Sequence, residues 1–425
     1  MAATSSGENT SIPLSPKSQS ITLTSLPPEI LANILTHVSH LPSKPQERNR
    51  TLCAIALTAR ALNYEPEREL YRVVKVHGIE DVMTLGTALN PFTQERVGRT
   101  ASFVRHLIVE GSFQDACSWE VISATLRLVA NLQTLTIITP SALPPSLMTN
   151  SNIVSKNIRS LTVPFAPTRS LAAVLASQSR MVHLSLTPSS HILTAPMESS
   201  DEITLGDFIK LLTPEVLPSL TSLRTPCTSL ATALILHRPL ERLWTSLPSV
   251  PSTSPPSYFA DPKYVSPTHP RMPEPVDSFV ASLTLSTRPL HVLHFTFPKS
   301  HSTNTGAFTA FLAYLATSNP SMTSLGIIPP SSILPLVSPH VHSPLNSLPK
   351  SNFPFLESLV LSSEPSPLTI FHLAQQIPSL RRVICGVFTT TEEYLCTPVN
   401  DGVGNEVARG MTEEDVWRAI GAGFL

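Results

Sequence analysis

Apolar residues recur at helical spacing near the start of the chain. In the segment LPPEILANILTHV, residues 26–38, Ile30, Ile34 and Val38 recur every four residues, with Leu31 and Leu35 beside them. This spacing predicts a short helix with one wide apolar face. Two prolines fall in its first turn, where a missing N–H costs little, and Glu29 stands where the helix dipole favours an acid.

A second helical pattern follows from residue 51, after a loop that contains proline and lysine. Its apolar positions are Leu52, Ile55, Ala56 and Ala59, and a further apolar patch consists of Leu62, Leu70, Tyr71, Val73 and Val74. The pattern predicts a compact helical unit. A fragment of about 50 residues has difficulty building a core of its own, so the apolar surface of this unit needs an explanation.

From about residue 104 a different pattern repeats ten times. Each copy has an apolar residue three positions before a central Leu or Val and, in most copies, another two positions after it. The copies are 104–109, 132–137, 158–163, 181–186, 220–225, 240–245, 290–295, 322–327, 356–361 and 380–385. This is the pattern of the strand in a leucine-rich repeat.

Proline follows seven of these segments within three residues, and since it cannot donate to a sheet we expect it to end the strands. These prolines are Pro140, Pro164, Pro188, Pro226, Pro248, Pro298 and Pro329. The chain contains 42 prolines, roughly twice the usual share of about 5%. If prolines end the strands, the high proline content of the chain has a structural explanation.

Stretches with helical spacing lie between the predicted strands. The stripes are Trp119, Ile122, Leu126 and Val129; Leu171, Val174 and Leu175; and Phe308, Phe311, Leu312 and Leu315. Strands that alternate with helices predict an α/β fold with a parallel sheet and crossovers on one side. The central residues are 20 to 50 positions apart, and the Asn typical of regular repeats is missing. We therefore expect an irregular solenoid, coiled into an arc.

The pattern divides the chain into five parts. We expect a disordered leader over 1–20, a helical unit over 21–76, a helical connector over 77–103, the solenoid over 104–390 and a C-terminal cap over 391–425. A Pro- and Ser-rich stretch, 246–277, has no apolar period and is interpreted as a surface insertion, with a peptide ligand or phosphorylation site as the alternative. The cap is expected to contain a helix that begins at Thr412.

Composition limits the classes of partner. The 425 residues have a formal net charge of -1, so no overall field attracts the chain to nucleic acid or to anionic membrane. No apolar stretch reaches about 18 residues, the length that would span a bilayer. The five cysteines form no CxxC pair, which favours buried thiols in a reducing compartment and, for Cys53, core packing. We expect a cytoplasmic or nuclear protein.

The sequence contains none of the common catalytic signatures. The motifs GxxxxGK[ST], GxGxxG, HExxH and GxSxG are absent, and only 14 glycines are available for close approach to a phosphate. The 14 histidines are spread singly, whereas a metal site needs several ligands. We expect no enzymatic activity, catalytic residue, cofactor or metal.

The segment from LPPEILANILTHV to ERELYRVVKV, roughly residues 22–76, resembles an F-box. The family's opening corresponds to residues 26–31, and its closing Leu-aromatic-Arg-x-Val is similar to residues 69–74, ELYRVV. Where many members have Val-Cys-Arg-x-Trp, this chain has LTARAL, residues 57–62, without a Trp. An F-box followed by irregular repeats, with VRHL at their start, resembles F-box proteins of mushroom-forming fungi.

This resemblance implies a substrate receptor of a Skp1-cullin-F-box (SCF) ubiquitin ligase. The F-box would bind a Skp1-type adaptor, and through it a cullin, while the repeats bind an unknown target protein; neither nucleic acid nor membrane is a partner. The adaptor would bury a helix-in-groove interface. Its implied contact residues are Leu26, Pro27, Pro28, Glu29, Ile30, Leu31, Ile34, Leu35, Leu70 and Tyr71. Three alternatives stay open: a repeat scaffold that needs no adaptor, a first helical unit that only caps the repeats, and an enzyme with an unrecognised site.

Overall fold

The computed structural model describes residues 26–40, 45–58, 64–90, 97–113, 115–150, 153, 157–188, 201–246, 274–296, 315, 318–328, 354–361, 379–387 and 393–398. The chain forms two compact units, Met1–Val73 and Val74–Leu425. Helices and a largely parallel sheet confirm the α/β class. The five expected parts, including 21–76 for the first unit, stay predictions.

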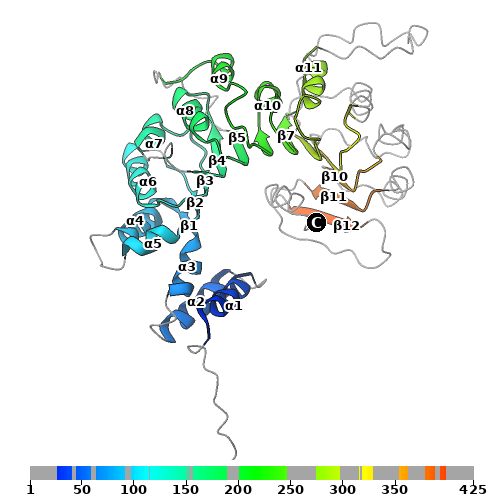
Figure 1. Ribbon diagram of the computed structural model, residues 1–425. Coiled ribbons are helices and arrows are strands. Elements are labelled where there is room, and N and C mark those ends of the chain that lie inside the picture. The colour runs from blue at the N-terminus through cyan, green and yellow to red at the C-terminus, as the bar shows by residue number, and fades with distance from the viewer. Residues whose placement is uncertain are drawn as a thin grey trace, which may run out of the picture. The chain divides into compact units, whose positions relative to one another are not determined.

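The first unit consists of three helices, drawn in blue in Figure 1. They are α1 (Pro28–His40), α2 (Pro45–Thr58) and α3 (Tyr64–Arg72). The first follows the predicted segment, with Pro28 as its first residue. The second ends at Thr58, so the expected positions Ala59 and Leu62 lie outside the described residues. Val73 and Val74, expected to extend the helical patch, begin a strand instead.

One sheet of twelve strands runs in sequence order from β1 to β12. The strands are β1 (Val73–His77), β2 (His106–Glu110), β3 (Thr134–Ile138), β4 (Ser160–Phe165), β5 (His183–Pro188), β6 (Ser222–Thr225), β7 (Arg242–Ser246), β8 (Val292–Thr296), β9 (Ser324–Ile328), β10 (Ser358–Leu361), β11 (Arg382–Val387) and β12 (Glu393–Pro398). From β2 to β11 every neighbouring pair is parallel, whereas β12 is antiparallel to β11.

The central apolar residue of each repeat occupies one row across the sheet. Leu107 pairs with Leu135, Leu135 with Leu161, and the register continues without a slip to Leu359 and Val383. The nine leucines of this row, from Leu107 to Leu359, are at most 1% exposed. Since a slip of one residue would turn every side chain to the opposite face, burial of the leucine row fixes the register.

Each repeat strand begins two residues later than predicted. The first apolar residue of each copy, such as Leu132 before β3, is buried but lies in the turn that precedes the strand. The sheet begins where one carbonyl accepts two N–H groups: Arg105 accepts from Gln133 at 2.8 Å and from Thr134 at 3.0 Å. The same double acceptor recurs between successive repeats and aligns the starts of their strands.

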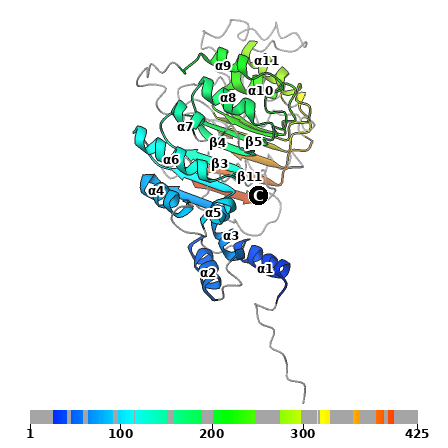
Figure 2. The ribbon, with the colours of Figure 1, turned by 60° about the vertical axis from the view of Figure 1, so that its left-hand side comes forward.

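Helices connect successive strands along one face of the sheet, and Figures 1 and 2 show them in a row on that side. They are α4 (Gly78–Leu89), α5 (Val97–Phe103), α6 (Ala116–Leu128), α7 (Pro145–Asn150), α8 (Arg169–Ser177), α9 (Leu205–Leu211), α10 (Thr228–Ile235) and α11 (Glu274–Leu283). The predicted stripes of α6 and α8 are buried. Of the third stripe only Leu315, also buried, lies among the described residues.

Two aromatic contacts establish which side chains of the strands face the helices. Phe165 of β4 meets Phe208 of α9 with ring centroids 5.7 Å apart, and Phe295 of β8 meets Phe279 of α11 at 6.0 Å. Both strand residues lie an even number of positions from the central leucine of their strand, so the leucine row faces the helices. The intervening residues lie on the opposite face of the sheet, which we call the open face, although several of its side chains are buried, among them Ser222, Trp244 and His294.

The prediction that proline ends the strands is wrong for Pro164, which lies inside β4 and pairs with Thr187 of β5. Beyond Thr162 the pairing of β4 with β3 has ended, so a missing N–H on that side breaks no ladder. Pro188 is the last residue of β5, and Pro226 directly follows β6. Pro248, Pro298 and Pro329 lie outside the described residues.

Helix α11 begins at Glu274, inside the stretch 246–277 that was interpreted as an insertion without period. Pro275 is the second residue of this helix, where proline lacks no needed N–H. Residues 247–273 of the insertion, the leader and the expected helix from Thr412 lie outside the described residues. Among the cap residues, 393–398 form the strand β12, which the sequence analysis does not predict.

The prediction of buried thiols is wrong for Cys53 and Cys117, which are exposed. Leu52 takes the inward position of α2, and the next residue of a helix points about 100° away from it. Cys227 is half-buried, and all three thiols are free.

A fully buried arginine joins the end of α10 to the loop before β6. The guanidinium of Arg238 donates to the carbonyl oxygens of Val216 at 2.8 Å, Thr213 at 2.8 Å, Ala233 at 3.0 Å and Leu236 at 3.2 Å. Burial lowers the pKa of Arg238 to about 10, so it stays charged at neutral pH. The charged guanidinium therefore links the backbone at the end of α10 to the backbone of the loop before β6.

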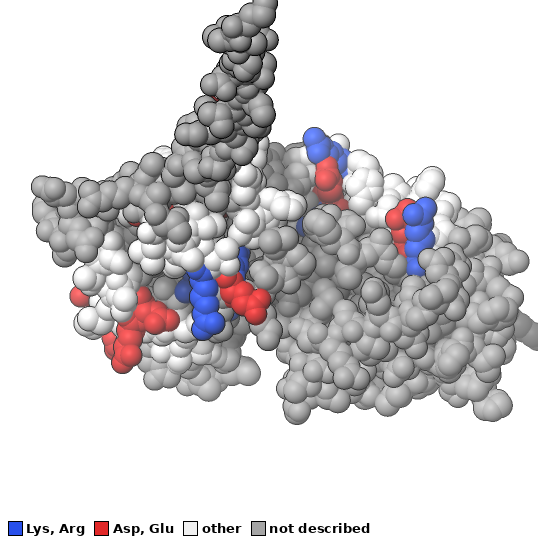
Figure 3. Space-filling model, turned by 90° about the horizontal axis from the view of Figure 1, so that it is seen from below, with Lys and Arg blue, Asp and Glu red and all other residues white. Residues whose placement is uncertain are grey.

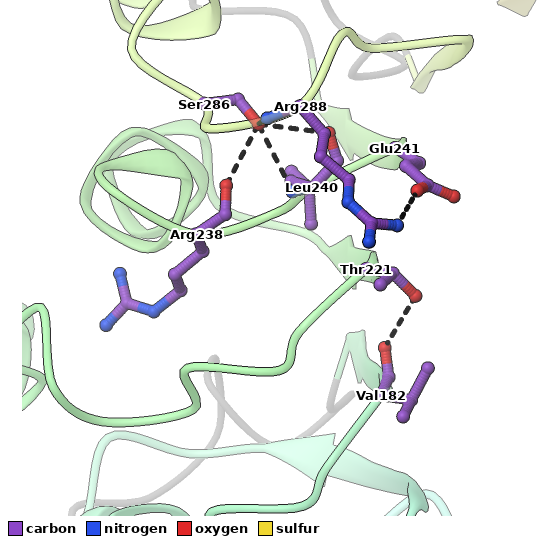
Figure 4. A network of polar contacts seen from close by, with 7 residues as sticks. All are labelled: Val182, Thr221, Arg238, Leu240, Glu241, Ser286 and Arg288. Carbon is purple, nitrogen blue, oxygen red and sulfur yellow. Dashed lines mark hydrogen bonds and ion pairs between the residues drawn. The ribbon is translucent and has the colours of Figure 1, made fainter.

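Beyond Arg238, one serine ties the next turn to the start of β7 (Figure 4). The hydroxyl of Ser286 lies 3.0 Å from the carbonyl oxygen of Arg238 and accepts the N–H of Leu240 at 3.1 Å. Nearby, Arg288 forms an ion pair with Glu241. These contacts hold successive repeats together at the edge where their strands begin.

Candidate functional site

The first helix opens with a turn that the sequence LPPE specifies. The carbonyl oxygen of Pro27 accepts the N–H groups of Ile30 and Leu31, both at 3.1 Å. Glu29 lies in the first turn, where its negative charge offsets the positive end of the helix dipole. The direction of α1 is therefore fixed from its first residues.

A small core holds the three helices of the first unit together. Leu31, Leu35 and Leu52 are 6%, 1% and 0% exposed, and three partly buried side chains pack against them: Val38, Ile55 and Leu70. The spacing of Leu31, Leu35 and Val38 places one stripe of α1 against α2 and α3. The unit thus closes an apolar cluster of its own, despite its size.

A second stripe of α1 faces outward. Ile30 is 46% exposed and Ile34 is 40% exposed, although both are large aliphatic side chains. They lie four residues apart and therefore share one side of the helix. Asn33 and His37 are also exposed and flank this pair. We call Ile30 and Ile34 the isoleucine pair.

The predicted adaptor-binding residues differ in how far they are buried. Leu31, Leu35 and Leu70 contribute to the internal cluster, while the isoleucine pair, Pro27 and Glu29 are exposed. The remaining residues with a described side chain are half-buried: Leu26 and Tyr71. Pro28 begins α1, but its side chain is outside the described set. The predicted role of all ten residues stays a prediction, and its accessible part is the outward surface of α1.

Ion pairs fix the third helix. Glu69 is only 8% exposed, and its carboxylate lies 3.6 Å from the guanidinium of Arg68 and 3.5 Å from that of Arg72. Arg68 also pairs with Glu65 at 3.0 Å. A nearly buried carboxylate requires such partners, so these pairs hold α3 in the orientation that brings Leu70 to the cluster.

The open face of the sheet is the other candidate surface. Four neighbouring strands carry, in one row, Arg224 of β6, Trp244 of β7, His294 of β8 and Gly326 of β9. The guanidinium carbon of Arg224 lies 4.3 Å from the centre of the Trp244 ring, and this ring meets the imidazole of His294 at 5.4 Å. The row is a continuous stack of a cation and two rings.

Burial lowers the pKa of two histidines on this face, and neighbouring arginines add to the effect. Burial is the larger cause for His294, with Arg242 and Arg224 adding to it, and its pKa falls to about 3. The pKa of His183 is lowered by burial and then by Arg242. Arg242 thus acts on both histidines and Arg224 on His294, because a nearby positive charge disfavours the protonated imidazole.

The described part of the chain was also searched for a metal site, a membrane-spanning helix and a patch of one charge. There, no group of three or more His, Cys, Asp or Glu residues could hold a metal ion. No helix among the described residues has the length and apolarity needed to cross a bilayer. On the face shown in Figure 3, basic and acidic side chains lie beside one another, so the described charges there form no patch of one sign.

The comparisons with known proteins identify no family. No protein-family model matches the chain, and no curated protein matches it. Among the solved structures that match is VinN with L-aspartate, with 11% identity over 77% of this chain and 74% of that chain and a TM-score of 0.19. Holo-PA1221, an NRPS protein containing adenylation and PCP domains bound to a vinylsulfonamide inhibitor, has 11% identity over 80% of this chain and 51% of that chain, with a TM-score of 0.19. The luciferase-like enzyme from the nonluminescent Zophobas morio mealworm has 10% identity over 79% of this chain and 73% of that chain, with a TM-score of 0.18. At such TM-scores these matches carry no argument about fold or activity.

Sequence reasoning did not find the stack of Arg224, Trp244 and His294. Each of these residues directly follows the central leucine of its strand, so the alternation of side chains already assigns all three to the open face. Neighbouring strands bring them together, because the repeat register is uniform. Aligning the ten segments by their central residue would have shown the row.

Proposed function

We propose that this chain is the substrate-receptor subunit of an SCF-type ubiquitin ligase. In this proposal the first unit is an F-box that binds a Skp1-type adaptor and through it a cullin. The second unit is an irregular leucine-rich-repeat-like solenoid that binds a target protein. The receptor positions the target, and the bond chemistry belongs to other subunits.

The isoleucine pair is the observation that carries the proposal. A helix that packs its leucines internally has no structural need for two further isoleucines on its outer side. Burying an aliphatic side chain of this size contributes about 1.5–3 kcal/mol. An exposed apolar pair at a spacing of four residues is suited to helix-in-groove recognition, and a specific interface of standard size buries about 800 Å² on each partner.

The second unit supports the target-binding half of the proposal. Ten parallel strands follow one another in sequence order and keep one register, with helices on one face. Such a stack is built from units that each contact mainly their neighbours, as in repeat proteins. Figure 1 shows the sheet bending with its helices on the outer side, so the face opposite the leucine row lies on the inner side of the bend.

Binding to a purified Skp1-type adaptor tests the proposal directly. The full-length chain would be compared with the double variant Ile30→Glu/Ile34→Glu, which replaces only outward side chains and keeps good helix formers. The matched control is Met83→Glu on α4, because Met83 is 54% exposed. We expect the double variant to lose at least about 100-fold in affinity, as for two central apolar contacts, and Met83→Glu to bind like the original chain.

Circular dichroism and thermal unfolding would confirm that all three proteins are folded. Failure of the original chain to bind the adaptor would overturn the proposal and favour a repeat scaffold that needs no adaptor. Equal binding by the original chain and the double variant would exclude the isoleucine pair as the contact.

A further inference from the structure

Four arginines lie at the edge of the sheet where the first repeat strands begin. Arg105 and Arg159 directly precede β2 and β4, and Gln133 links them. The N–H of Gln133 donates to the carbonyl oxygen of Arg105, and its carbonyl oxygen accepts the N–H of Arg159, both at 2.8 Å. Arg180 belongs to the turn before β5, and Arg127 to the last turn of α6, which leads into the turn before β3. We call these four residues the arginine edge.

The side chains of the arginine edge are accessible. Arg127, Arg159 and Arg180 are exposed, and within the described part of the chain their guanidinium groups form neither a hydrogen bond nor an ion pair. Arg105 is half-buried, and one N–H of its guanidinium donates to the carbonyl oxygen of Asn131 at 3.3 Å. A guanidinium has five N–H donors, so nearly all donors of the arginine edge are available to a ligand.

No acidic side chain lies among the described turn and strand-start residues around the arginine edge. These residues are 102–106, 127–134, 157–160 and 177–183. Further along the same edge, beside β7, Arg288 forms an ion pair with Glu241 (Figure 4). The chain thus pairs its own arginine with an acid there, whereas the described residues around the arginine edge leave the positive charge without a carboxylate.

The helix dipole does not explain all four charges. Arg127 is in the last turn of α6, where a cation offsets the negative end of the dipole. That effect falls off within the last turn, whereas Arg180 lies three residues beyond the end of α8 at Ser177, and Arg159 directly precedes a strand. The charges of Arg159 and Arg180 therefore stabilise none of the described helices.

We infer that the arginine edge binds an acidic segment, rich in Asp and Glu, of a partner protein. The fork of a guanidinium matches a carboxylate, with which it forms two parallel hydrogen bonds. The turns before β2 and β5 are about 14 Å apart, because neighbouring strands are separated by about 4.8 Å. An extended segment spaces alternate side chains by about 7 Å, so two or three of its carboxylates reach this edge at once. The inference rests on the proposed function only in that this partner would be the ubiquitination target.

Nucleic acid fits the arginine edge less well. Strong binding to a polyanion uses about 6–10 phosphate contacts, whereas this edge has four arginines. Phosphates also favour the free N–H groups of helix N-termini, but α6 and α8 end at this edge, and the N–H groups of Gln133, Arg159 and Val182 already donate to the neighbouring turns. The formal net charge of -1 provides no wider positive field. A short acidic peptide matches the number of cations.

Fluorescence anisotropy with a labelled peptide of about ten residues, alternating Glu and Gly, tests the inference on the full chain. The variant is Arg159→Gln/Arg180→Gln. The matched control, Arg50→Gln/Arg169→Gln, removes two exposed arginines from other places, α2 and the first residue of α8 at the opposite edge of the sheet. We expect the variant to lose at least about tenfold in affinity and the control less than about twofold. Affinity should also fall as salt is raised.

The substitutions replace exposed side chains, so the variants should fold, and circular dichroism checks this. Charge reversal provides a second test. Arg159→Glu/Arg180→Glu should reject the acidic peptide and gain affinity for a Lys-Gly peptide of equal length.

Three results would each overturn the inference: a Ser-Gly peptide that binds as well as the Glu-Gly peptide, a single-stranded oligonucleotide that binds more tightly, or equal losses in the variant and the control. Adaptor binding is measured separately. Acidic-peptide binding without adaptor binding would refute the proposed function alone, and the reverse result would refute this inference alone.

Discussion

The imidazole of His294 lies directly against the backbone of Gly326 on the next strand. A Cβ atom at residue 326 would be 2.5 Å from both Cγ and Cδ2 of the ring. The two residues are register partners in β8 and β9, so the strands cannot separate locally to make room. Glycine is therefore required here by close packing, and the ring in turn fills the space over the glycine.

This contact predicts that Gly326→Ala destabilises the second unit. We expect a loss of about 1–3 kcal/mol in the free energy of unfolding, as for other overpacked sites, measured by urea denaturation. Combining it with His294→Ala should cost less than the sum of the two single changes, because the clash disappears. Gly206→Ala is the control, since its new Cβ would meet only Thr204 Oγ1 at 3.8 Å. Equal effects of both glycine changes would contradict the contact.

The lowered pKa of His294 also predicts that the folded chain loses stability in acid. This pKa is about 3 in the folded chain and about 6.5 when unfolded, so below pH 6.5 the unfolded state binds more protons. The stability from this group is complete above pH 6.5 and falls as the pH drops toward 3. Between pH 6.5 and 5.0 the loss amounts to about 1.5–2 kcal/mol.

His294→Phe removes the titrating group while keeping a ring beside Trp244. Its unfolding free energy should therefore decline less between pH 6.5 and 5.0 than that of the original chain, whereas the two should change in parallel between pH 7.5 and 8.5. Urea denaturation at each pH measures both curves. If the unfolding free energies of both proteins declined equally between pH 6.5 and 5.0, the pKa of His294 in the folded chain would not be lowered, despite its neighbours Arg224, Arg242 and Ser324.

The same substitution should cost very different amounts of stability at Arg238 and at Arg288. Arg238→Met leaves four carbonyl oxygens without their shared donor, and we expect it to cost about 3 kcal/mol or more. Arg288 is 58% exposed and pairs with Glu241, so Arg288→Met should cost at most about 1 kcal/mol. Thermal and urea unfolding of the two variants make the comparison. Similar losses would contradict the structural role assigned to Arg238.

The repeating strands could be predicted because their pattern is local. Each segment combines a buried residue in a turn with a central leucine, and both positions are readable within six residues. The register then follows from burial of one face. The start of each strand was misplaced by two residues because a buried apolar residue in a turn resembles one in a strand until its hydrogen bonds are known.

Features that depend on distant partners could not be predicted. Pro164 is tolerated only because pairing with β3 ends before it, and Gly326 is needed only because His294 lies above it. In the first unit, the sequence placed Ile30, Leu31, Ile34 and Leu35 on one wide face. The structure separates them, since α2 and α3 are wide enough to cover only the leucines.

That separation predicts distinct effects for two neighbouring residues of α1. Leu35 is 1% exposed within the cluster, so Leu35→Ala should destabilise the first unit by about 2–5 kcal/mol. Ile34 is 40% exposed, and Ile34→Ala should cost well under half as much. Amide hydrogen exchange over α1 to α3 reports the stability of this unit separately.

Adaptor binding should rank the same variants in the opposite way. At a temperature where both are folded, Ile34→Ala loses an interface contact, whereas Leu35→Ala keeps the outward surface of α1. If Leu35→Ala lost affinity while its exchange protection stayed intact, the inner stripe would have to open toward the partner. The isoleucine pair would then be only the edge of a larger site that forms when the adaptor binds.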